Sequence, residues 1–263
     1  MSAAWLDAAT TVLLRDGAAG PEVLLLERLR HRGSFAGAWV FPGGHVDPED
    51  DDGGAGPGAS AEEALGRAVR RAGAREAWEE TGLRPDPEEL VPLSVWMPPA
   101  SAPKQVRTWY FVGTAPEGDV VVHDAEHHGY RWLTPARALE EHAAGRMQLV
   151  PPTFVTLTRL AGHPDAAAAL EAARASGVER YSSRLLEAGG RRLVLWDGDE
   201  DYDRADHAAS GRTASGPIDS GLTGVDEAGV DEAGEGRPAA AGPAGARHRL
   251  DVTGLPWRYE RTV

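Results

Sequence analysis

Apolar residues along the first two hundred positions of this chain follow two periods, one typical of strands and one typical of helices. Two apolar runs flank a turn-rich stretch and predict a β-hairpin: "ATTVLLRDG" and "PEVLLLERL" around "DGAAGPE". Strands are also predicted at "WVFPGG" and "RTWYFVGTA". The later stretch "DVVVHDAEHHGYRWLTP" predicts a strand, a loop and a second short strand.

Helical patterns lie between and after these strands. Pro135 suits the first position of a helix in "PARALEEHAAG", and Gly145 suits its end. The stretches "PTFVTLTRLAG" and "DAAAALEAARASG" are also predicted to be helical. Strands that alternate with helices in this way indicate a single α/β or α+β domain.

The clearest helix signal begins at Ser60, with Glu63 three residues later. This pair forms a capping box, in which each residue satisfies a backbone donor at the start of a helix. Apolar positions then recur on one stripe, and Gly82 suits the end of the helix. The stripe contains Leu65, Val69 and Ala72 and continues into Glu76 and Glu80. We expect a helix at about residues 60–81 whose buried face runs into acidic residues.

The composition changes at about residue 204. Residues 204–247 are rich in Gly, Ala, Asp and Glu and repeat "GVDEAGVDEAGEG". Such a segment buries too little apolar surface to offset the entropy of ordering, so we expect a disordered insert. The stretch before it, "RRLVLWDGDEDYD", predicts a strand. We therefore divide the chain into a domain at 1–203 with a helical C-terminal extension, the insert at 204–247, and a strand-like segment at 248–263 that packs on the domain.

The 263 residues carry a formal net charge of −14 and include no cysteine. The lack of cysteine excludes disulfides and thiolate metal sites, and the acidic balance argues against a surface that coats nucleic acid. A phosphorylated small molecule is compatible with this charge if divalent metal ions neutralise both carboxylates and phosphates. The N-terminal stretch has no basic flank followed by a long apolar run. We therefore expect a cytoplasmic protein without a membrane span.

Four charged residues gather near the end of the predicted helix: Arg75, Glu76, Glu79 and Glu80. A solvated helix end explains most clusters of this kind. Here the three glutamates fall at positions i, i+3 and i+4, which brings their carboxylates within one Mg²⁺ coordination radius, and Mg²⁺ prefers oxygen ligands. A glycine turn follows them and "FPGG" precedes them, so we favour a cation site.

These residues resemble the Nudix box, G-x(5)-E-x(7)-R-E-U-x-E-E-x-G-U, where U is an apolar residue. Gly44 matches its first glycine, and the second half is matched by Arg75, Glu76, Ala77, Glu79, Glu80, Gly82 and Leu83. Asp50 stands at the position of the first glutamate, with Glu49, Asp51 and Asp52 as alternatives. The interval from Asp50 to Arg75 is much longer than seven residues, so the box contains an insertion. The resemblance implies the Nudix fold, a mixed β-sheet sandwiched between α-helices, and metal-dependent hydrolysis of a nucleoside diphosphate linked to another group.

The interrupted box resembles the acyl-coenzyme A diphosphatase group of Nudix enzymes. The upstream stretch "LLLERLRHRGSFAGAWVFPGG" matches part of that group's pattern L-L-T-x-R-S-x(3)-R-x(3)-G-x(3)-F-P-G-G. The resemblance implies that Arg28, Arg32, Phe41 and Gly44 bind substrate. Forked donor pairs of the two arginines would suit the phosphates of coenzyme A, and a solvent-facing basic turn explains these arginines equally well.

The resemblance also implies roles for the acidic residues. Glu76 and Glu80 are expected to be the principal Mg²⁺ or Mn²⁺ ligands, with Glu79 completing the cluster and the Gly43 carbonyl adding a ligand. The expected catalytic set is Glu79, Arg75, which holds the glutamates in place, and Glu126, the candidate general base. Glu126 lies among His123, Asp124, His127 and His128. A polar surface loop is nearly as good an explanation for each of these histidines.

We therefore expect a hydrolase that cleaves coenzyme A or an acyl-coenzyme A to adenosine 3',5'-bisphosphate and a phosphopantetheine product. The alternative substrates are ADP-ribose, a dinucleotide or a capped RNA end. The alternative class is a non-catalytic domain that senses a nucleotide, and the intact trio of glutamates favours an enzyme. The expected partner is a small nucleotide-like molecule, and a homodimer is one possible assembly.

Overall fold

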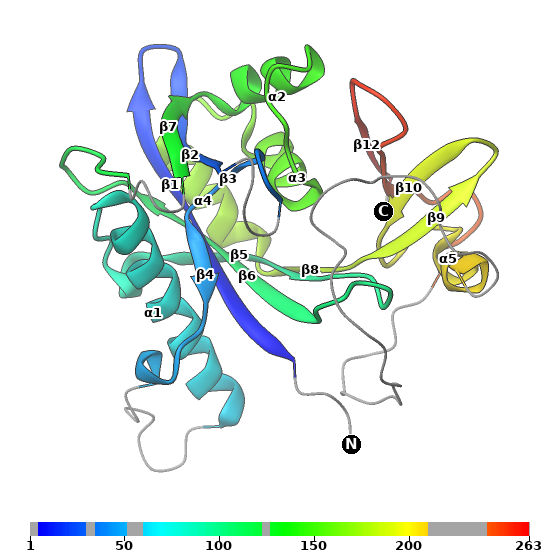
Figure 1. The fold of residues 1–263 in the computed structure, drawn as a ribbon, viewed down its shortest axis with the longest axis horizontal. Coiled ribbons are helices and arrows are strands. Elements are labelled where there is room, and N and C mark those ends of the chain that lie inside the picture. Colours follow the sequence, from blue (N-terminus) through cyan, green and yellow to red (C-terminus); the bar gives the residue numbers. More distant parts are fainter. Residues whose placement is uncertain (1–4, 30–34, 52–59, 123–126, 210–240, 263) are drawn as a thin grey trace.

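The computed structural model describes residues 5–29, 35–51, 60–122, 127–209 and 241–262. In this part of the chain, eight strands form one mixed sheet in which six follow the order β3-β2-β1-β6-β5-β8 (Figure 1). β4 pairs with β1, and β7 pairs with β2. The strands are β1 (Leu6–Gly17), β2 (Gly20–Arg28), β3 (Trp39–Val40), β4 (Gly43–His45), β5 (Val91–Met97), β6 (Val106–Thr114), β7 (His127–Leu133) and β8 (Glu179–Ser182).

The predicted hairpin is confirmed, because β1 and β2 are antiparallel and their register closes at Gly17 and Gly20. β6 runs parallel to β1 along nine residue pairs, which places β1 in the centre of the sheet. Both faces of β1 are buried as well, because side chains from other elements pack on each side of it. Ala9 packs toward one face with Val69 and Phe111, whereas Val12 and Leu14 belong to the core on the other face.

Helices cover both faces of the sheet (Figure 1). α1 (Ala61–Thr81) packs on one face through Val69, Ala72 and Ala74. The opposite face is covered by α2 (Pro135–Ala143), α3 (Pro151–Leu160) and α4 (Ala166–Ser176), whose buried residues join the largest core cluster. The expected arrangement, a mixed sheet between helices, is confirmed. Two short 3-10 helices, η1 (Pro48–Asp50) and η2 (Pro87–Glu89), precede and follow α1.

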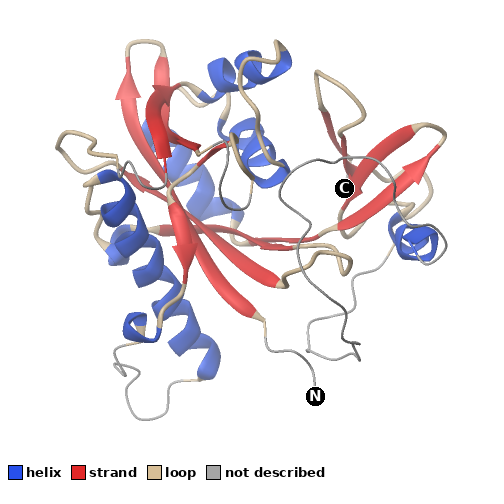
Figure 2. Ribbon diagram, viewed as in Figure 1, coloured by secondary structure: helices blue, strands red, loops and turns tan. Residues whose placement is uncertain are grey.

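A second, antiparallel sheet follows β8 in the C-terminal part of the chain (Figure 2). Its order is β12-β11-β10-β9, and its strands are β9 (Arg184–Ala188), β10 (Arg191–Leu195), β11 (His248–Asp251) and β12 (Arg258–Arg261). An aromatic cluster joins it to the first sheet. Trp96 of β5 stacks on Tyr181 of β8 with ring centroids 3.9 Å apart, and both rings meet the edge of Trp196. The two sheets therefore share one core.

The strands predicted at "RRLVL" and "HRLD" are present as β10 and β11, which pair with each other. Disorder was predicted from residue 204 onward, and for the first residues of this segment the prediction is wrong, because they belong to α5 (Tyr202–Ala209). Tyr202 and Ala205 bury themselves against Leu186, Leu193 and Leu195, and this contact compensates the ordering entropy. Residues 210–240 of the predicted insert lie outside the described residues.

Two further corrections concern strands. Residues 119–122, expected to form a strand, have no regular structure, because the backbone N–H of Val121 donates to the Thr81 carbonyl (2.8 Å) at the end of α1. The strands β5, β8 and β9 were not predicted. In β5, Pro92 interrupts the pattern that would otherwise indicate a strand.

Candidate active site

α1 forms where the sequence predicts it. The Ser60 hydroxyl accepts from the Glu63 backbone and the Glu63 carboxylate accepts from the Ser60 backbone, which is the predicted capping box. Gly82 ends the helix with a left-handed φ of 73°, a conformation that glycine adopts without steric cost. Glu76 and Glu80 contact Gly44 and Gly43 of β4, so the acidic end of the helix lies against the strand that begins with the two glycines of "FPGG".

Arg75 is the centre of the charged network at this end of α1. Its Nε and Nη2 donate to the two carboxylate oxygens of Asp50, at 3.1 and 2.9 Å. Its Nη1 donates to Glu76 (2.9 Å) and Glu79 (3.1 Å), and Nη2 also reaches the His45 carbonyl. The hydrogen bond to Asp50 raises the pKa of Arg75, so the guanidinium is always charged. Arg75 therefore connects α1, η1 and β4.

Asp50 is buried, and it joins the two halves of the interrupted motif. Besides binding Arg75, its carboxylate accepts from the backbone N–H of Asp47 (2.9 Å) and so caps η1. Arg71 donates to the Asp50 carbonyl (3.3 Å). The shorter side chain at this position thus makes a forked ion pair with Arg75 across the intervening residues, which is the geometry that favours arginine over lysine.

Glu76 lies directly against the backbone of Gly44. A Cβ atom added to Gly44 would come within 2.4 Å of the Glu76 carboxyl carbon, so only glycine leaves room for this carboxylate. Burial, partly offset by the hydrogen bond from Arg75, raises the pKa of Glu76 above its usual value. The site therefore holds a carboxylate that a nearby cation would stabilise.

Glu80 is buried between β4 and β7. One carboxylate oxygen, Oε2, accepts from the backbone N–H of Gly43 (2.9 Å). The other, Oε1, lies 3.6 Å from Nε2 of His127, the first residue of β7. A Cβ on Gly43 would clash with the Ala9 carbonyl at 2.4 Å, so both glycines of "PGG" are required for close approach of β4 to its neighbours. Glu76 and Glu80 thus face two consecutive glycines.

A family model described as NUDIX domain matches residues 5–152. The chain belongs to the Nudix family. It is accordingly a Nudix hydrolase, a pyrophosphohydrolase of nucleoside diphosphate derivatives, and enzymes of this family generally use divalent metal ions. Among curated proteins none matches the chain.

Solved Nudix structures share the fold. A NUDIX hydrolase from Alicyclobacillus acidocaldarius has a TM-score of 0.55 and 23% identity, over 64% of this chain and 96% of that one. A MutT NUDIX hydrolase from Burkholderia pseudomallei has a TM-score of 0.42 and 23% identity, over 59% and 98%. The NUDIX domain of Shewanella oneidensis NrtR, crystallised with ADP ribose, has a TM-score of 0.42 and 20% identity, over 59% and 86%. Only the first TM-score is high enough to support the fold.

The glutamates of the Nudix box have different partners in the structure. Glu79 is half exposed and turns toward Arg75, whereas Glu80 points to Gly43 and His127. The part of the chain that the structure describes contains no group of three histidine, aspartate or glutamate side chains spaced to hold one ion. The metal-ligand role expected for the three glutamates stays a prediction, and Glu79 is the member of the trio that pairs with Arg75.

The donors that remain still fit a divalent cation. Glu76 and Glu80 supply carboxylate oxygens, the type of ligand that Mg²⁺ and Mn²⁺ prefer, and both lie against β4. The close fit of Glu76 against Gly44, next to the contact of Glu80 with Gly43, is the observation that supports this conclusion. Glu126, the expected base, lies outside the described residues.

The expected substrate-binding residues divide into three groups. Arg28 ends β2 opposite His127 of β7, next to the site, and Gly44 contacts Glu76. Phe41 is buried in the core, where its ring meets the edge of the Tyr110 ring at 6.3 Å, so this contact accounts for the side chain and its role toward substrate stays a prediction. Arg32 lies outside the described residues.

His127 is the site residue that the sequence did not reveal. Its side chain is fully buried, so the surface-loop explanation is wrong for this histidine. Burial, together with the nearby Arg28 guanidinium, lowers the pKa of His127 to about 4, so the ring is neutral near pH 7. Neither effect can be read from the sequence, because both depend on the pairing of β7 with β2.

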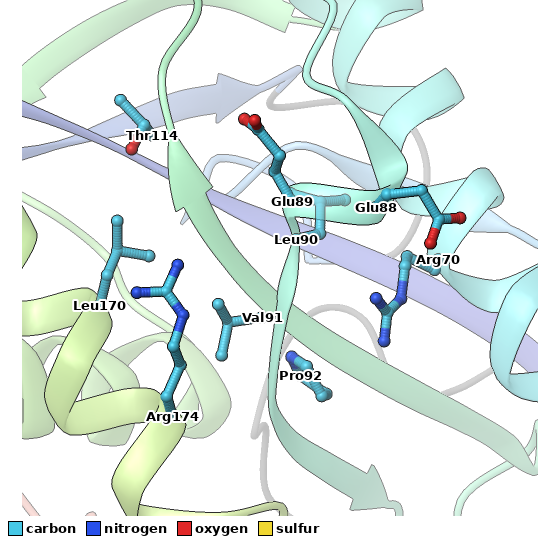
Figure 3. A pocket seen from close by; sticks show the side chains of 9 residues that line it. All are labelled: Arg70, Glu88, Glu89, Leu90, Val91, Pro92, Thr114, Leu170 and Arg174. Atoms are coloured by element: carbon cyan, nitrogen blue, oxygen red, sulfur yellow. The ribbon is translucent and has the colours of Figure 1, made fainter.

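Two surface cavities lie outside the glutamate pair. The larger, of about 560 Å³, opens beside β5, where Figure 3 shows Arg70 and Arg174 on either side of Val91 and Pro92. The smaller, of about 270 Å³, is lined by Trp78, Glu79, Gly82, Val121 and Val122. Neither is lined by Glu76 or Glu80, and Glu79 is the member of the expected trio that lines the smaller one. Within the described residues, no helix combines the length and apolarity needed to cross a membrane.

Proposed function

We propose that this Nudix hydrolase cleaves the pyrophosphate bond of coenzyme A or an acyl-coenzyme A, with adenosine 3',5'-bisphosphate and a phosphopantetheine as products. The observation that supports a hydrolytic site here is the placement of Glu76 against Gly44 and of Glu80 against Gly43. The preference for coenzyme A rests on the resemblance of the upstream sequence and of the interrupted box to the acyl-coenzyme A diphosphatase group.

Glu76, Glu80 and the Gly43 carbonyl would hold the divalent metal, Mg²⁺ or Mn²⁺. When bound, the metal polarises a phosphoryl oxygen and activates water. The protein residues supply orientation. Arg75 fixes Glu76 through its Nη1 and is itself fixed by Asp50, so the catalytic helix and η1 keep a constant relative position.

Arg28 is the described residue that we propose for the substrate phosphates. It lies at the end of β2, across from His127, and its Nε is buried without a hydrogen-bond partner among the described residues. A guanidinium recognises two phosphate oxygens at once, and Arg28 therefore suits a diphosphate. We propose Glu126, which precedes β7 by one residue, as the general base.

A substrate panel tests the proposal. Purified protein is incubated with Mg²⁺ or Mn²⁺ and, in separate reactions, with coenzyme A, an acyl-coenzyme A, ADP-ribose, a dinucleotide and capped RNA. Chromatography then measures the products. We expect adenosine 3',5'-bisphosphate from the coenzyme A substrates at the highest kcat/KM. Cleavage of ADP-ribose with coenzyme A left intact would show that the preferred substrate is wrong. Tight nucleotide binding without any turnover would favour a sensor.

A further inference from the structure

His127 is a buried polar side chain whose ring nitrogens make no hydrogen bond among the described residues. Within the described residues, neither its Nδ1 nor its Nε2 has a hydrogen-bond partner, although the ring is fully buried. Buried polar groups almost always have partners, and an exception calls for an explanation. Another buried histidine shows the usual situation, since Nδ1 of His142 lies 2.9 Å from the Met147 carbonyl. His142 therefore serves the structure, whereas no such contact accounts for His127.

The strand pairing aims His127 at the site. β7 pairs with β2, and the register between them shifts between Glu27 and Arg28, so that Arg28 is opposite His127. Irregularities of this kind re-aim side chains and are common next to active sites. The result is that Nε2 of His127 lies 3.6 Å from Oε1 of Glu80.

Glu80 has one oxygen fixed and one facing His127. Oε2 accepts from the Gly43 N–H, which ties the carboxylate to β4. Oε1 is on the side of β7. A second donor at Oε1 would leave the carboxylate one orientation, and a partner that orients a metal ligand in this way typically changes metal affinity by ten- to a hundredfold.

We propose that His127 is a positioning residue for Glu80, its Nε2–H orienting Oε1 so that the Glu80 carboxylate is set to bind the divalent cation. This inference rests on the proposed metal site but not on the identity of the substrate. A neutral imidazole has one N–H donor, and Oε1 of Glu80 lies 3.6 Å from Nε2, so a small rotation of either side chain brings the two atoms into hydrogen-bond distance.

The test measures Mn²⁺ binding by the full-length protein without substrate, from the electron paramagnetic resonance signal of free Mn²⁺. Three variants are compared with the wild type. H127L removes the donor, and H127Q retains an amide N–H at a similar reach. H142L replaces a buried histidine of α2, away from Glu76 and Glu80. Thermal unfolding of each variant reports on folding separately.

We expect H127L to weaken Mn²⁺ binding about tenfold or more, H127Q to restore most of the affinity, and H142L to bind as the wild type does. The inference is overturned if H127L binds Mn²⁺ normally, if H127L and H142L weaken binding equally, or if H127Q is as weak as H127L. It is also overturned if the wild type binds no Mn²⁺. Normal Mn²⁺ binding with no cleavage of coenzyme A would contradict only the proposed substrate.

Discussion

Asp50 and Arg75 show how one ion pair restores a motif that the chain interrupts. The sequence leaves the role of Asp50 open, because its distance from Arg75 does not match the usual spacing of the Nudix box. In the structure, η1 places Asp50 against α1, where its carboxylate accepts two hydrogen bonds from Arg75. The Asp50 side chain is buried, and Arg75 is partly exposed. Spatial proximity, rather than sequence spacing, therefore defines the site.

The substitution Asp50→Asn tests this contact. It keeps the shape but removes the charge that faces Arg75, and we expect it to lower the free energy of unfolding by about 1–3 kcal/mol. Urea denaturation measures the change. The adjacent exposed residue offers a matched control, Glu49→Gln, which we expect to leave the unfolding free energy within about 0.5 kcal/mol of the wild type. Equal effects of the two substitutions would argue against a structural role for Asp50.

The substitution Gly44→Ala tests the placement of Glu76. The added Cβ would lie 2.4 Å from the Glu76 carboxyl carbon, so the carboxylate has to move. A displacement of about 1 Å at a catalytic centre lowers kcat by about 100-fold. In Gly66→Ala, the control on α1, the added Cβ meets no heavy atom within 4 Å, and we expect full activity. Wild-type turnover by Gly44→Ala would contradict the role given to Glu76.

At the scale of the element, α1 is the part that the sequence predicts best. Its capping box, its apolar stripe and its glycine end are all local signals, and each is present in the structure. The ion pair of Glu79 with Arg75 is local, since the two residues are one helical turn apart. The surroundings of Glu80 are not local, because it meets His127 of a strand that begins 47 residues later, and only the folded sheet brings these two residues together.

The capping box gives a prediction for α1 itself. Ser60→Ala removes the hydroxyl that accepts from the Glu63 N–H, and we expect it to lower the free energy of unfolding by about 1 kcal/mol. Because Ser60 and the glutamates lie at opposite ends of a 21-residue helix, kcat should stay at the wild-type value. Denaturation and steady-state kinetics check the two expectations. A large loss of kcat would mean that the start of α1 also contributes to the site.

For the whole molecule, the C-terminal sheet is part of the same core as the Nudix sheet. The family match ends at residue 152, yet Tyr181, Trp196 and Leu250 belong to the cluster that also contains Val12 and Leu25. The sequence predicted β10 and β11 as strands but not the link between the two sheets, because the rings of Trp96 and Tyr181 come together only through the pairing of β5 with β8.

Two buried histidines in this core give a pH prediction. Burial lowers the pKa of His142 and of His248 below the value of about 6.5 that an unfolded chain has. As pH falls below about 6.5, the unfolded chain binds protons that the folded protein does not, so stability decreases. Urea denaturation between pH 7.5 and 5 should show this loss, and His248→Gln should reduce its slope. An unchanged slope in both His248→Gln and His142→Gln would contradict the assignment.

The central claim is that Glu80 serves metal-dependent hydrolysis of a pyrophosphate bond, and one comparison tests it most directly. Wild type and Glu80→Gln are assayed with Mg²⁺ and with Mn²⁺ for formation of adenosine 3',5'-bisphosphate from coenzyme A, and for cleavage of the other substrates in the panel. We predict that the wild type is active and that Glu80→Gln, folded as judged by its thermal unfolding, loses about 100-fold or more of kcat. Equal turnover by the two proteins would contradict the claim.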